Sequence, residues 1–577
     1  MLQIVTWWAL FIGAVSLGLG VTEVVRKASG NLRAFRPDLF GLAWLGLAFA
    51  IGFLEVASVF LPIGRACMVV LLLLALPSIS TAVALLFRAA RRSLRRTVVG
   101  TLLVAIWIGG VSFVILQGAN APVVQSDTVS THIQQVMWAR DYGSVIGLGI
   151  LNPKLAFDQS GHLLAALLDH GVFHDRSVRV AVPFFIWLTL VQWVATLFRS
   201  TRHAGDVRAK CFCGLTLPFL LIKTQSSEVS SFSGDLSMAC VALPTVLALI
   251  RLPIVKPGAK IDRLRAMLRR HAYDCMVLGS LGALLITIKL SGMIVSIFAL
   301  GLFVLSVLAA GRWRYWLSSF VPILLVLGML ARRIVISGWL LYPFPVGNLS
   351  LPWSISEADA TNEYRWIQSW GRLPDQKPEE VLDQGFFHWF VPWFDKFCKQ
   401  PELTVCFIAA ALLTLRFTSS LRRSIPISMN EAVGTSALFL SCLFWFCGAP
   451  DLRFGAVFIW MFAAAVAIPF FAANYLTETT PKILLAAVTA LSLAWVSNGW
   501  VHLLYAPVSG EVPESAIRWT SNTQPLIVPN LVEPPLTVNV PVAGQSCGDA
   551  PLPCVPAIYV KKQQLRRPGD LSSGFVP

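Results

Sequence analysis

The sequence predicts an all-α polytopic membrane protein with about fourteen transmembrane helices. Of its 577 residues, 56% are hydrophobic and only 13% are charged, and the mean hydropathy is +0.69. Apolar runs of about 20 residues, the length that crosses a bilayer as a helix, recur from one end of the chain to the other. Basic residues gather in alternate connections between these runs, which is typical of multi-pass membrane proteins.

The predicted spans follow the apolar runs in chain order. No basic residue stands between Met1 and Leu10, so the first run is expected to remain as a span and not to be cleaved as a signal peptide. The runs are 4–22, 39–62, 67–88, 98–117, 178–198, 211–223, 236–252, 274–290, 293–309, 315–331, 402–416, 431–448, 455–474 and 482–505.

The basic loops predict the orientation of the chain, because positively charged loops remain in the cytoplasm. The other connections, together with both termini, are then external: 118–158, 224–235, 332–401, 448–453 and the tail from 507. Anionic lipid headgroups suffice as partners for the formal net charge of +16, and no nucleic-acid-binding pattern is present. The basic clusters run from Arg26 to Arg36, Arg88 to Arg96, Arg199 to Lys210, Lys256 to Arg270, Arg312 to Arg314 and Arg416 to Arg423.

The cysteines divide into two groups. Cys547 and Cys554 lie in the external Pro-rich tail, where the compartment permits oxidation, and are expected to form a disulfide that closes a small loop. Most of the others lie in or beside apolar runs and are predicted to be small packing residues. The pair Cys211 and Cys213 lacks the companion ligands of a metal site.

The first external loop, 118–158, contains the principal catalytic candidates, Asp127 and Asp141. Between them, Val129, Ile133, Val136 and Met137 form a narrow apolar stripe at helical spacing, with Gln134, Gln135 and Arg140 facing away. Trp138 and Tyr142 add rings that favour a membrane interface, so this helix is predicted to lie flat on the outer leaflet. A structural alternative stays open for Asp127, because Asp is also a favoured helix N-cap.

Three further external segments carry candidate polar residues. Asp235 follows a Ser/Gly-rich turn, a pattern that is also typical of the N-terminal cap of a helix. Arg332 and Arg333 are adjacent at an outer membrane boundary, which opposes the charge bias; they suit a lipid phosphate, or they snorkel to carboxylates and headgroups. Asp451 and Arg453 share a tight turn, where they pair with each other or reach a central cavity.

Two weaker candidates remain. Glu55 is an acidic residue within a predicted span, which makes it a functional candidate or a partner of a neighbouring helix. His170 and His174 are four residues apart with Asp169 and Asp175 beside them, but the intervening Gly171 weakens the helix that would align two zinc ligands.

Several of these residues belong to an ordered set of motifs that extends from about residue 120 to the end of the chain. Together they resemble a family of bacterial multi-pass envelope proteins that is similar to the GT-C class of glycosyltransferases, which use polyprenyl-phosphate-linked sugars. The motifs are Asp127, His132, Trp138, Gly147, Leu148, Asn152, Leu155 and Phe157; Ser230, Ser231, Ser233 and Asp235; Ser337, Gly338, Trp339, Tyr342 and Pro343; Pro450 to Gly455; and Cys547, Asp549 to Cys554 and Pro556.

The resemblance implies a GT-C-like transmembrane core over 98–506, extra transmembrane helices over 1–97 and an external Pro-rich tail over 507–577. It places the protein in the bacterial cytoplasmic (inner) membrane with the active site facing the periplasm. The composition and periodicity of the tail predict no fold for it.

The resemblance also implies residue roles. Asp127 matches the acidic residue of the first external loop, with Asp141 as the alternative. Binding of the donor phosphate falls to Arg332, Arg333 or Arg453. Residues expected to line the substrate are His132, Trp138, Asn152, Asp235, Tyr342 and Asp451.

The implied reaction is transfer of a sugar, with inversion, from a polyprenyl-phosphate donor to a lipid-linked or envelope glycan acceptor. No cofactor is predicted, and the chain lacks a second acidic residue directly beside Asp127 that would complete a divalent metal site. The three extra predicted spans over 1–97, which stand ahead of the core, depart from the usual GT-C arrangement.

Two other functions fit the sequence. An envelope polysaccharide polymerase or ligase would depend on the outer-loop arginines and not on a first-loop acid. A transporter of lipid-linked glycans would carry polar residues at the membrane midplane and repeated broken helices, for which Glu55 is the main candidate residue.

Overall fold

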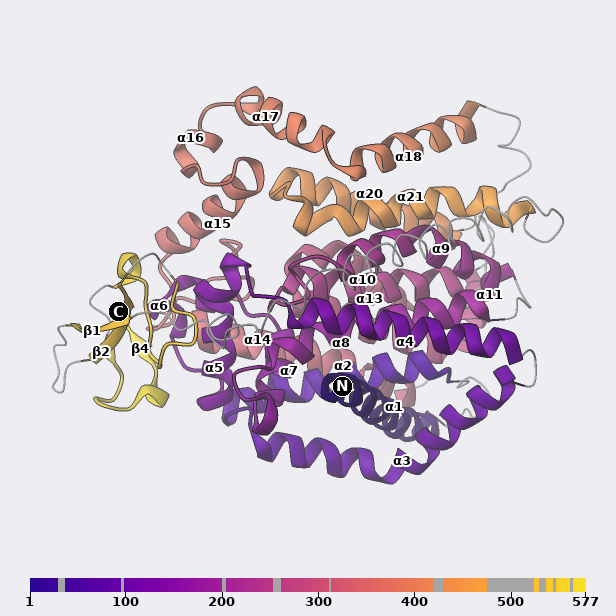
Figure 1. The fold of residues 1–577 in the computed structure, drawn as a ribbon, viewed down its shortest axis with the longest axis horizontal. Coiled ribbons are helices and arrows are strands. Elements are labelled where there is room, and N and C mark those ends of the chain that lie inside the picture. Colours follow the sequence, from indigo (N-terminus) through magenta and orange to yellow (C-terminus); the bar gives the residue numbers. More distant parts are fainter. Residues whose placement is uncertain are drawn as a thin grey trace, which may run out of the picture.

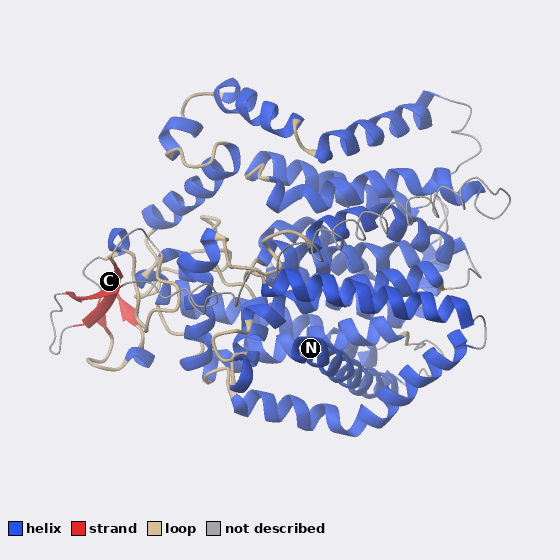
Figure 2. Cartoon of the chain, in the orientation of Figure 1, coloured by secondary structure: helices blue, strands red, loops and turns tan. Residues whose placement is uncertain are grey.

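The computed structural model describes residues 1–29, 37–94, 98–199, 204–252, 261–310, 313–418, 429–474, 523–528, 536–542, 546–560 and 564–577. The predicted run 482–505 lies outside these residues. Long helices form a bundle, and the connections predicted to be external gather at the end of it where the tail packs (Figure 1). Helices dominate the described chain, and the strands are confined to the tail (Figure 2).

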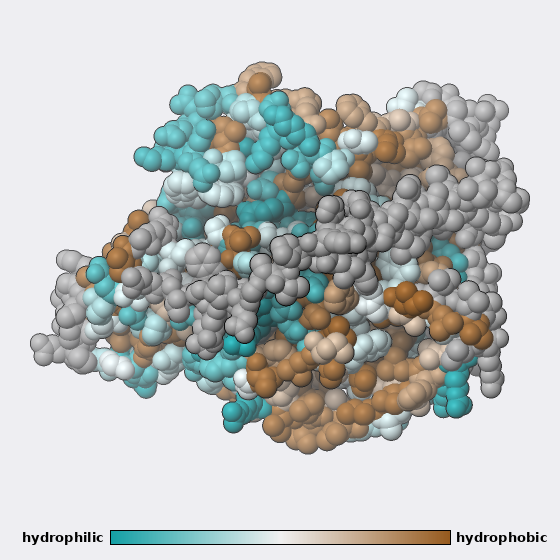
Figure 3. Space-filling view, viewed as in Figure 1, coloured by the Kyte–Doolittle hydropathy of each residue, from teal (hydrophilic) through white to brown (hydrophobic). Residues whose placement is uncertain are grey.

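Each apolar run within the described residues is helical. Buried hydrophobic side chains from most of the long helices form one large core. On the surface, hydrophilic residues gather over α15 and α16 (Figure 3). The long helices are α1 (Leu2–Ser29), α2 (Leu39–Phe60), α3 (Arg65–Leu94), α4 (Val98–Asn120), α8 (Val178–Phe198), α9 (Ala204–Thr224), α10 (Gly234–Arg251), α12 (Ala272–Ile288), α13 (Met293–Ala310), α14 (Phe320–Ser337), α18 (Pro401–Thr418), α20 (Met429–Gly448) and α21 (Leu452–Asn474).

Nine of the helices that the structure describes are long and apolar enough to cross a membrane, or ten if the bent pair 386–415 counts as one span. The protein is therefore a multi-pass α-helical membrane protein, with fewer spans identified in the described part than the sequence predicts. Two of the predicted runs form shorter apolar helices, Val104–Asn120 and Ala272–Ile288, while α9, which contains the run 211–223, is not among the nine.

Small residues allow the first two helices to approach closely. A Cβ atom on Gly46 of α2 would lie 1.8 Å from the carbonyl oxygen of Ala14 in α1, and one on Gly18 would lie 2.0 Å from the carbonyl oxygen of Leu42. The backbones therefore touch directly, as small residues permit in membrane helices. At the start of α2, the Asp38 side chain accepts hydrogen bonds from Phe40 N and Gly41 N, which satisfies two free backbone donors.

Short elements connect the long helices at the end that the sequence predicts to be external. They are the π-helix η1 (Thr128–His132), α5 (Ile133–Asp141), α6 (Leu148–Leu151), η2 (Pro153–Ala156), α7 (Gly161–Leu168), η3 (Gly171–Phe173), η4 (Leu290–Gly292), α15 (Glu357–Arg372), α16 (Pro378–Leu382) and α17 (Phe386–Cys398). The remaining helical segments are α11 (Ile261–Arg270) and η5 (Trp313–Ser319), and η6 (Ala557–Tyr559) and η7 (Leu571–Ser573) in the tail.

The helix α5 differs from its prediction as a helix lying on the outer leaflet. Its supposedly outward-facing Gln134 and Gln135 are buried, as are Val136 and Trp138. The reason is that both faces are covered: the Gln135 amide donates to carbonyl oxygens of Lys154 and Phe157, and Gln134 is covered by the tail.

The tail forms a small folded unit, which the sequence did not predict. Strands β1 (Thr523–Val528) and β2 (Leu536–Pro541) pair antiparallel, and so do β3 (Gln564–Leu565) and β4 (Phe575–Val576). Residues of β2 and β4 share a hydrophobic cluster with residues of α5, α6 and η2. The tail is thus built onto the first external loop, and among the residues that the structure describes these two short sheets are the only ones.

Candidate functional site

Five charged side chains from separate parts of the chain meet at the end of the bundle that the sequence predicts to be external. We call Asp127, Asp235, Lys289, Asp451 and Arg453 the outer charged cluster. The Arg453 guanidinium lies 3.1 Å from Asp127 Oδ2 and 3.6 Å from Asp451 Oδ2. Lys289 forms an ion pair with Asp235 and lies 4.3 Å from the centre of the Phe454 ring.

Asp127 does not act as the helix cap that the sequence left open. It precedes η1, but its backbone is already helical and its side chain makes no capping hydrogen bond within this described segment. The carboxylate turns to Arg453, which begins the first turn of α21, and its side chain stays 54% exposed. A carboxylate that is both held by an arginine and open to an incoming molecule is suited to proton transfer.

The surroundings keep Asp127 ionised. Burial acts to raise its pKa, but His132, the Arg453 guanidinium and the Lys289 ammonium together outweigh that effect and lower the pKa below its ordinary value. Burial lowers the pKa of His132 itself to about 4, so this ring is neutral at neutral pH. The positive charges that lower the pKa of Asp127 there are those of Arg453 and Lys289.

His132 connects the outer charged cluster to a second histidine. Its ring lies 4.9 Å from the His162 ring, centre to centre. His162 Nε2 lies 3.1 Å from the carbonyl oxygen of Phe232, and burial lowers the pKa of His162 to about 3. Two neutral imidazoles therefore lie between the exposed acid and the interior.

A buried ion cluster lies close to His162, which lines the same small cavity as Asp158 and Arg332. Arg332 donates from Nε to Asp158 at 3.0 Å and from Nη1 to Ser58 at 2.9 Å, and its Nε lies 3.2 Å from Glu55 Oε2. The Glu55 side chain is fully buried, and those of Asp158 and Arg332 are at most 8% exposed. Glu55 thus has the partner that the sequence could not name.

The structure shows the surroundings of Arg332 and Arg333, for which the sequence left open phosphate binding and pairing with carboxylates. Both side chains are buried, and Arg332 is engaged by two carboxylates, so it presents no free charge to a lipid phosphate. Of the three arginines predicted to bind a donor phosphate, Arg453 alone belongs to the outer charged cluster.

A small cavity adjoins the buried ion cluster. Its volume is about 20 Å³, which is room for about one water molecule and not for a sugar. Its polar lining residues are Gln135, Trp138, Asp158, Gln159, His162 and Arg332. The outer charged cluster, in contrast, is open to solvent at Asp127, whose side chain is 54% exposed.

Asp141, the alternative catalytic residue, belongs to a different ion cluster. Arg140 Nε and Nη2 donate to its two carboxylate oxygens at 2.7 and 2.9 Å, and Arg140 Nη1 lies 2.7 Å from Asp169 Oδ2 and 3.2 Å from Asp175 Oδ1. The carboxylates raise the pKa of Arg140 despite the opposing effect of burial. Asp141 is thus fully engaged by a neighbouring cation.

Three of the residues considered as zinc ligands belong to the same ion cluster. Ligand atoms of Asp169, His174 and Asp175 lie within 4.8 Å of one another, but Arg140 Nη1 contacts all three. His170 lies apart, with Nε2 3.3 Å from the Ile63 carbonyl oxygen. A guanidinium already supplies the positive charge that these groups would offer to a metal.

Other residues expected to line the substrate have packing or capping roles. The Asn152 side chain accepts a hydrogen bond from Lys154 N and caps η2. Tyr342 is buried and stacks on Phe157 at 5.6 Å, and burial raises its pKa. Trp138 is buried between Tyr142 and Phe575 of the tail.

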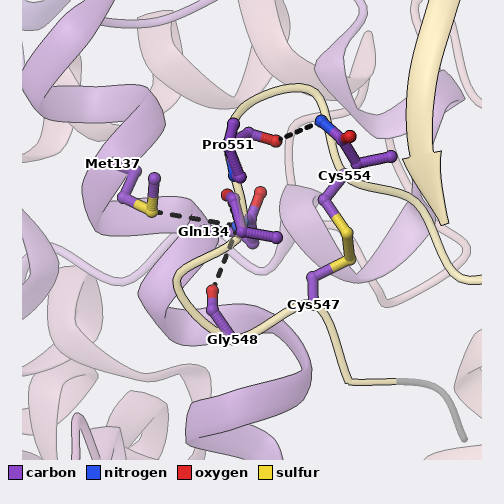
Figure 4. Close-up of a disulfide and its surroundings, with 8 residues drawn as sticks. Gln134, Met137, Cys547, Gly548, Pro551 and Cys554 are labelled. Carbon is purple, nitrogen blue, oxygen red and sulfur yellow. Dashed lines mark hydrogen bonds between the residues drawn. A yellow bond between two sulfur atoms is a disulfide. The ribbon is translucent and has the colours of Figure 1, made fainter. Parts of the chain in front are cut away.

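The tail holds the segment that carries Asp127 and His132. The structure contains the disulfide Cys547–Cys554, and the loop that it closes lies against η1 and α5 (Figure 4). Gln134 Nε2 donates to the carbonyl oxygens of Gly548 at 3.1 Å and Ala550 at 2.9 Å. Gly548 N in turn donates to the carbonyl oxygen of Val129 at 2.7 Å, so the loop fixes both helical segments.

Lys289 is the member of the outer charged cluster that the sequence analysis missed. It ends the apolar run of α12 on the outer side, where a basic residue opposes the positive-inside bias. Arg332 and Arg333 oppose the same bias and were noted for it, so the signal for Lys289 was present in the sequence.

Over residues 1–460, the chain matches the family described as a domain of unknown function, DUF8201, and it belongs to that family. No curated protein and no solved structure matches the chain.

Proposed function

We propose that this member of the DUF8201 family is a membrane glycosyltransferase. It transfers a sugar from a polyprenyl-phosphate-linked donor to a lipid-linked or envelope glycan acceptor, at the outer face of the bacterial cytoplasmic membrane. The observation that carries the proposal is the outer charged cluster: an exposed, ionised Asp127 held 3.1 Å from Arg453, with Lys289 beside them.

The cluster supplies the two functions that the reaction needs. Asp127 accepts the proton of the acceptor hydroxyl as its oxygen attacks the anomeric carbon. The bond from that carbon to the phosphate oxygen breaks, and the phosphate leaves with the electron pair. Arg453 and Lys289 stabilise the charge that grows on the phosphate, and direct displacement inverts the anomeric centre.

The buried ion cluster favours transfer over transport. A transporter needs polar groups that meet its cargo near the membrane midplane. Here Glu55 and Asp158 already pair with Arg332, and the adjoining cavity of about 20 Å³ holds no more than about one water molecule. These charges support the fold around the site.

The experiment compares two half-exposed carboxylates that each pair with an arginine but lie at different places in the structure. The gene is deleted in the native host and complemented with wild type, with Asp127→Asn or with the control Asp383→Asn, and lipid-linked and surface glycans are compared by mass spectrometry. Asp383 is 53% exposed and also pairs with an arginine, Arg365, at 2.8 Å, but it lies on the external loop away from the cluster.

The proposal expects one specific sugar to be lost in both the deletion and Asp127→Asn, with Asp383→Asn equal to wild type. A glycan of intact composition but single-repeat length in the deletion strain would point to a polymerase. Complete lipid-linked glycan that accumulates on the inner leaflet, with rescue by Asp127→Asn, would point to transport. Full activity in a stably expressed Asp127→Asn protein would refute the role of Asp127.

A further inference from the structure

The helix α17 has three distinct faces. Trp389, Trp393 and Phe397 are buried, whereas Phe387, Val391 and Phe394 are exposed at helical spacing of four and three residues. The exposed fractions of these three side chains are 75%, 60% and 43%. We call them the apolar stripe. The third face is polar and exposed and contains His388 and Asp395, and Lys399 follows directly after the end of the helix.

The buried face sets the depth of α17 relative to the membrane-spanning helices. The Trp393 ring lies 6.2 Å from Trp445 and 5.5 Å from Phe446, both near the outer end of α20. Ile459 of α21 belongs to the same hydrophobic cluster. Because α20 and α21 are both candidate spans, a helix packed on their outer turns lies at the level of the outer leaflet.

The course of the chain agrees with that depth. After α17, the chain bends by 91° within two residues and continues as the apolar helix α18 (Figure 1). An amphipathic helix that joins an apolar helix at such an angle, with a large exposed aromatic side chain and a polar face beside it, has the pattern of an element at the boundary between lipid and water.

The helix α17 also contacts the turn that leads to the outer charged cluster. Trp393 Nε1 donates to the carbonyl oxygen of Pro450 at 2.7 Å. Arg372 lies 4.8 Å from the Trp389 ring and donates to the carbonyl oxygens of Cys447 and Gly448. A displacement of α17 would therefore shift the 447–453 turn, which positions Arg453.

We infer that the apolar stripe of α17 is a docking surface for the phospholipids of the outer leaflet. Phe387, Val391 and Phe394 insert among the acyl chains, and the polar face, with Lys399, lies toward the headgroups and water. By this contact the lipid surface fixes the depth of the 447–453 turn. This inference concerns an interaction surface and does not depend on the reaction proposed above.

Spin labels on neighbouring faces of this one helix test the inference. The full chain is prepared with Cys398→Ser and Cys447→Ser, which removes the exposed free cysteines that the structure describes. Single labels are placed by Phe387→Cys and Phe394→Cys on the apolar stripe, and by His388→Cys and Asp395→Cys on the polar face. Each protein is placed in nanodiscs of phosphatidylethanolamine and phosphatidylglycerol, and collision with oxygen is compared with collision with a water-soluble nickel chelate.

The inference expects labels on the apolar stripe to collide mainly with oxygen and labels on the polar face mainly with nickel. Nickel access at all four positions would overturn it, because the stripe would then face water. Protection from both reagents at 387 and 394 would also overturn it, because protein, such as a second copy of the chain, would then cover the stripe. A difference between the two faces also reports that the helix is folded, because an unfolded segment would give the same collision pattern at all four positions.

Discussion

Replacement of Arg332 by Met tests whether the buried ion cluster supports the fold. The substitution keeps a long side chain but removes the one cation that contacts Glu55 and Asp158, whose side chains are 0% and 1% exposed. Breaking a buried pair by removing one partner costs about 3–5 kcal/mol, because the remaining charge is left uncompensated. Here two carboxylates would be left, so we expect a loss of at least about 3 kcal/mol.

Thermal stability in detergent, followed by the monodisperse fraction in size-exclusion chromatography, measures this loss. The control is Arg365→Met, which removes the arginine of the half-exposed pair with Asp383, where such a bridge contributes only about 0–1 kcal/mol. A triple variant with Glu55→Gln and Asp158→Asn added should recover part of the stability, since both buried carboxylates are removed while the buried guanidinium of Arg333 remains. Equal stability of Arg332→Met and Arg365→Met would refute the reasoning.

Three further predictions concern helix contact, pH dependence and the tail. Gly46→Leu should destabilise the protein by about 1–3 kcal/mol, since its Cβ would meet the Ala14 carbonyl oxygen. Thermal unfolding measures this loss, with Gly13→Leu, at a position with open space, as the control. Because the pKa of Asp127 is lowered, its carboxylate stays ionised as the pH falls and is protonated only below the ordinary pKa of about 3.9, so transfer rates should show no loss from this group above about pH 5. Arg453→Gln should raise the pH at which activity falls, because the guanidinium that lowers the pKa is removed. An unchanged pH–rate profile in that variant would contradict the pairing. Cys547→Ser should destabilise the tail by about 2.5 kcal/mol on a loop-entropy estimate and increase its cleavage in limited proteolysis, whereas unchanged cleavage would show that the disulfide does not hold the tail.

Part of the fold and of the candidate site could be predicted from the sequence. Hydropathy is a local property, so the apolar runs indicated the helices. Three members of the outer charged cluster besides Asp127 were also chosen individually, because Asp235, Asp451 and Arg453 stand at the outer ends of such runs. The sequence did not show that they meet, since Asp127 and Arg453 are 326 residues apart.

The role of α5 was mistaken for a related reason. Periodicity shows which side chains share a face of a helix, but not what covers the opposite face. Gln134 faces away from the apolar side chains of α5, and this segment considered alone has the pattern of a helix lying on a membrane. The hydrogen bonds to Gly548 and Ala550, more than 400 residues later, bury that face.

The sequence by itself determined that this is a multi-pass helical membrane protein, because a bilayer acts on each segment separately through its length and apolarity. Only the tertiary structure decided which charges are available for chemistry. Arg332 and Arg453 look alike in the sequence, yet Arg332 is buried between Asp158 and Glu55, while Arg453 meets an exposed Asp127. The physical reason is that the function of a charge depends on its partners and its burial, and both are set by segments far apart in the chain.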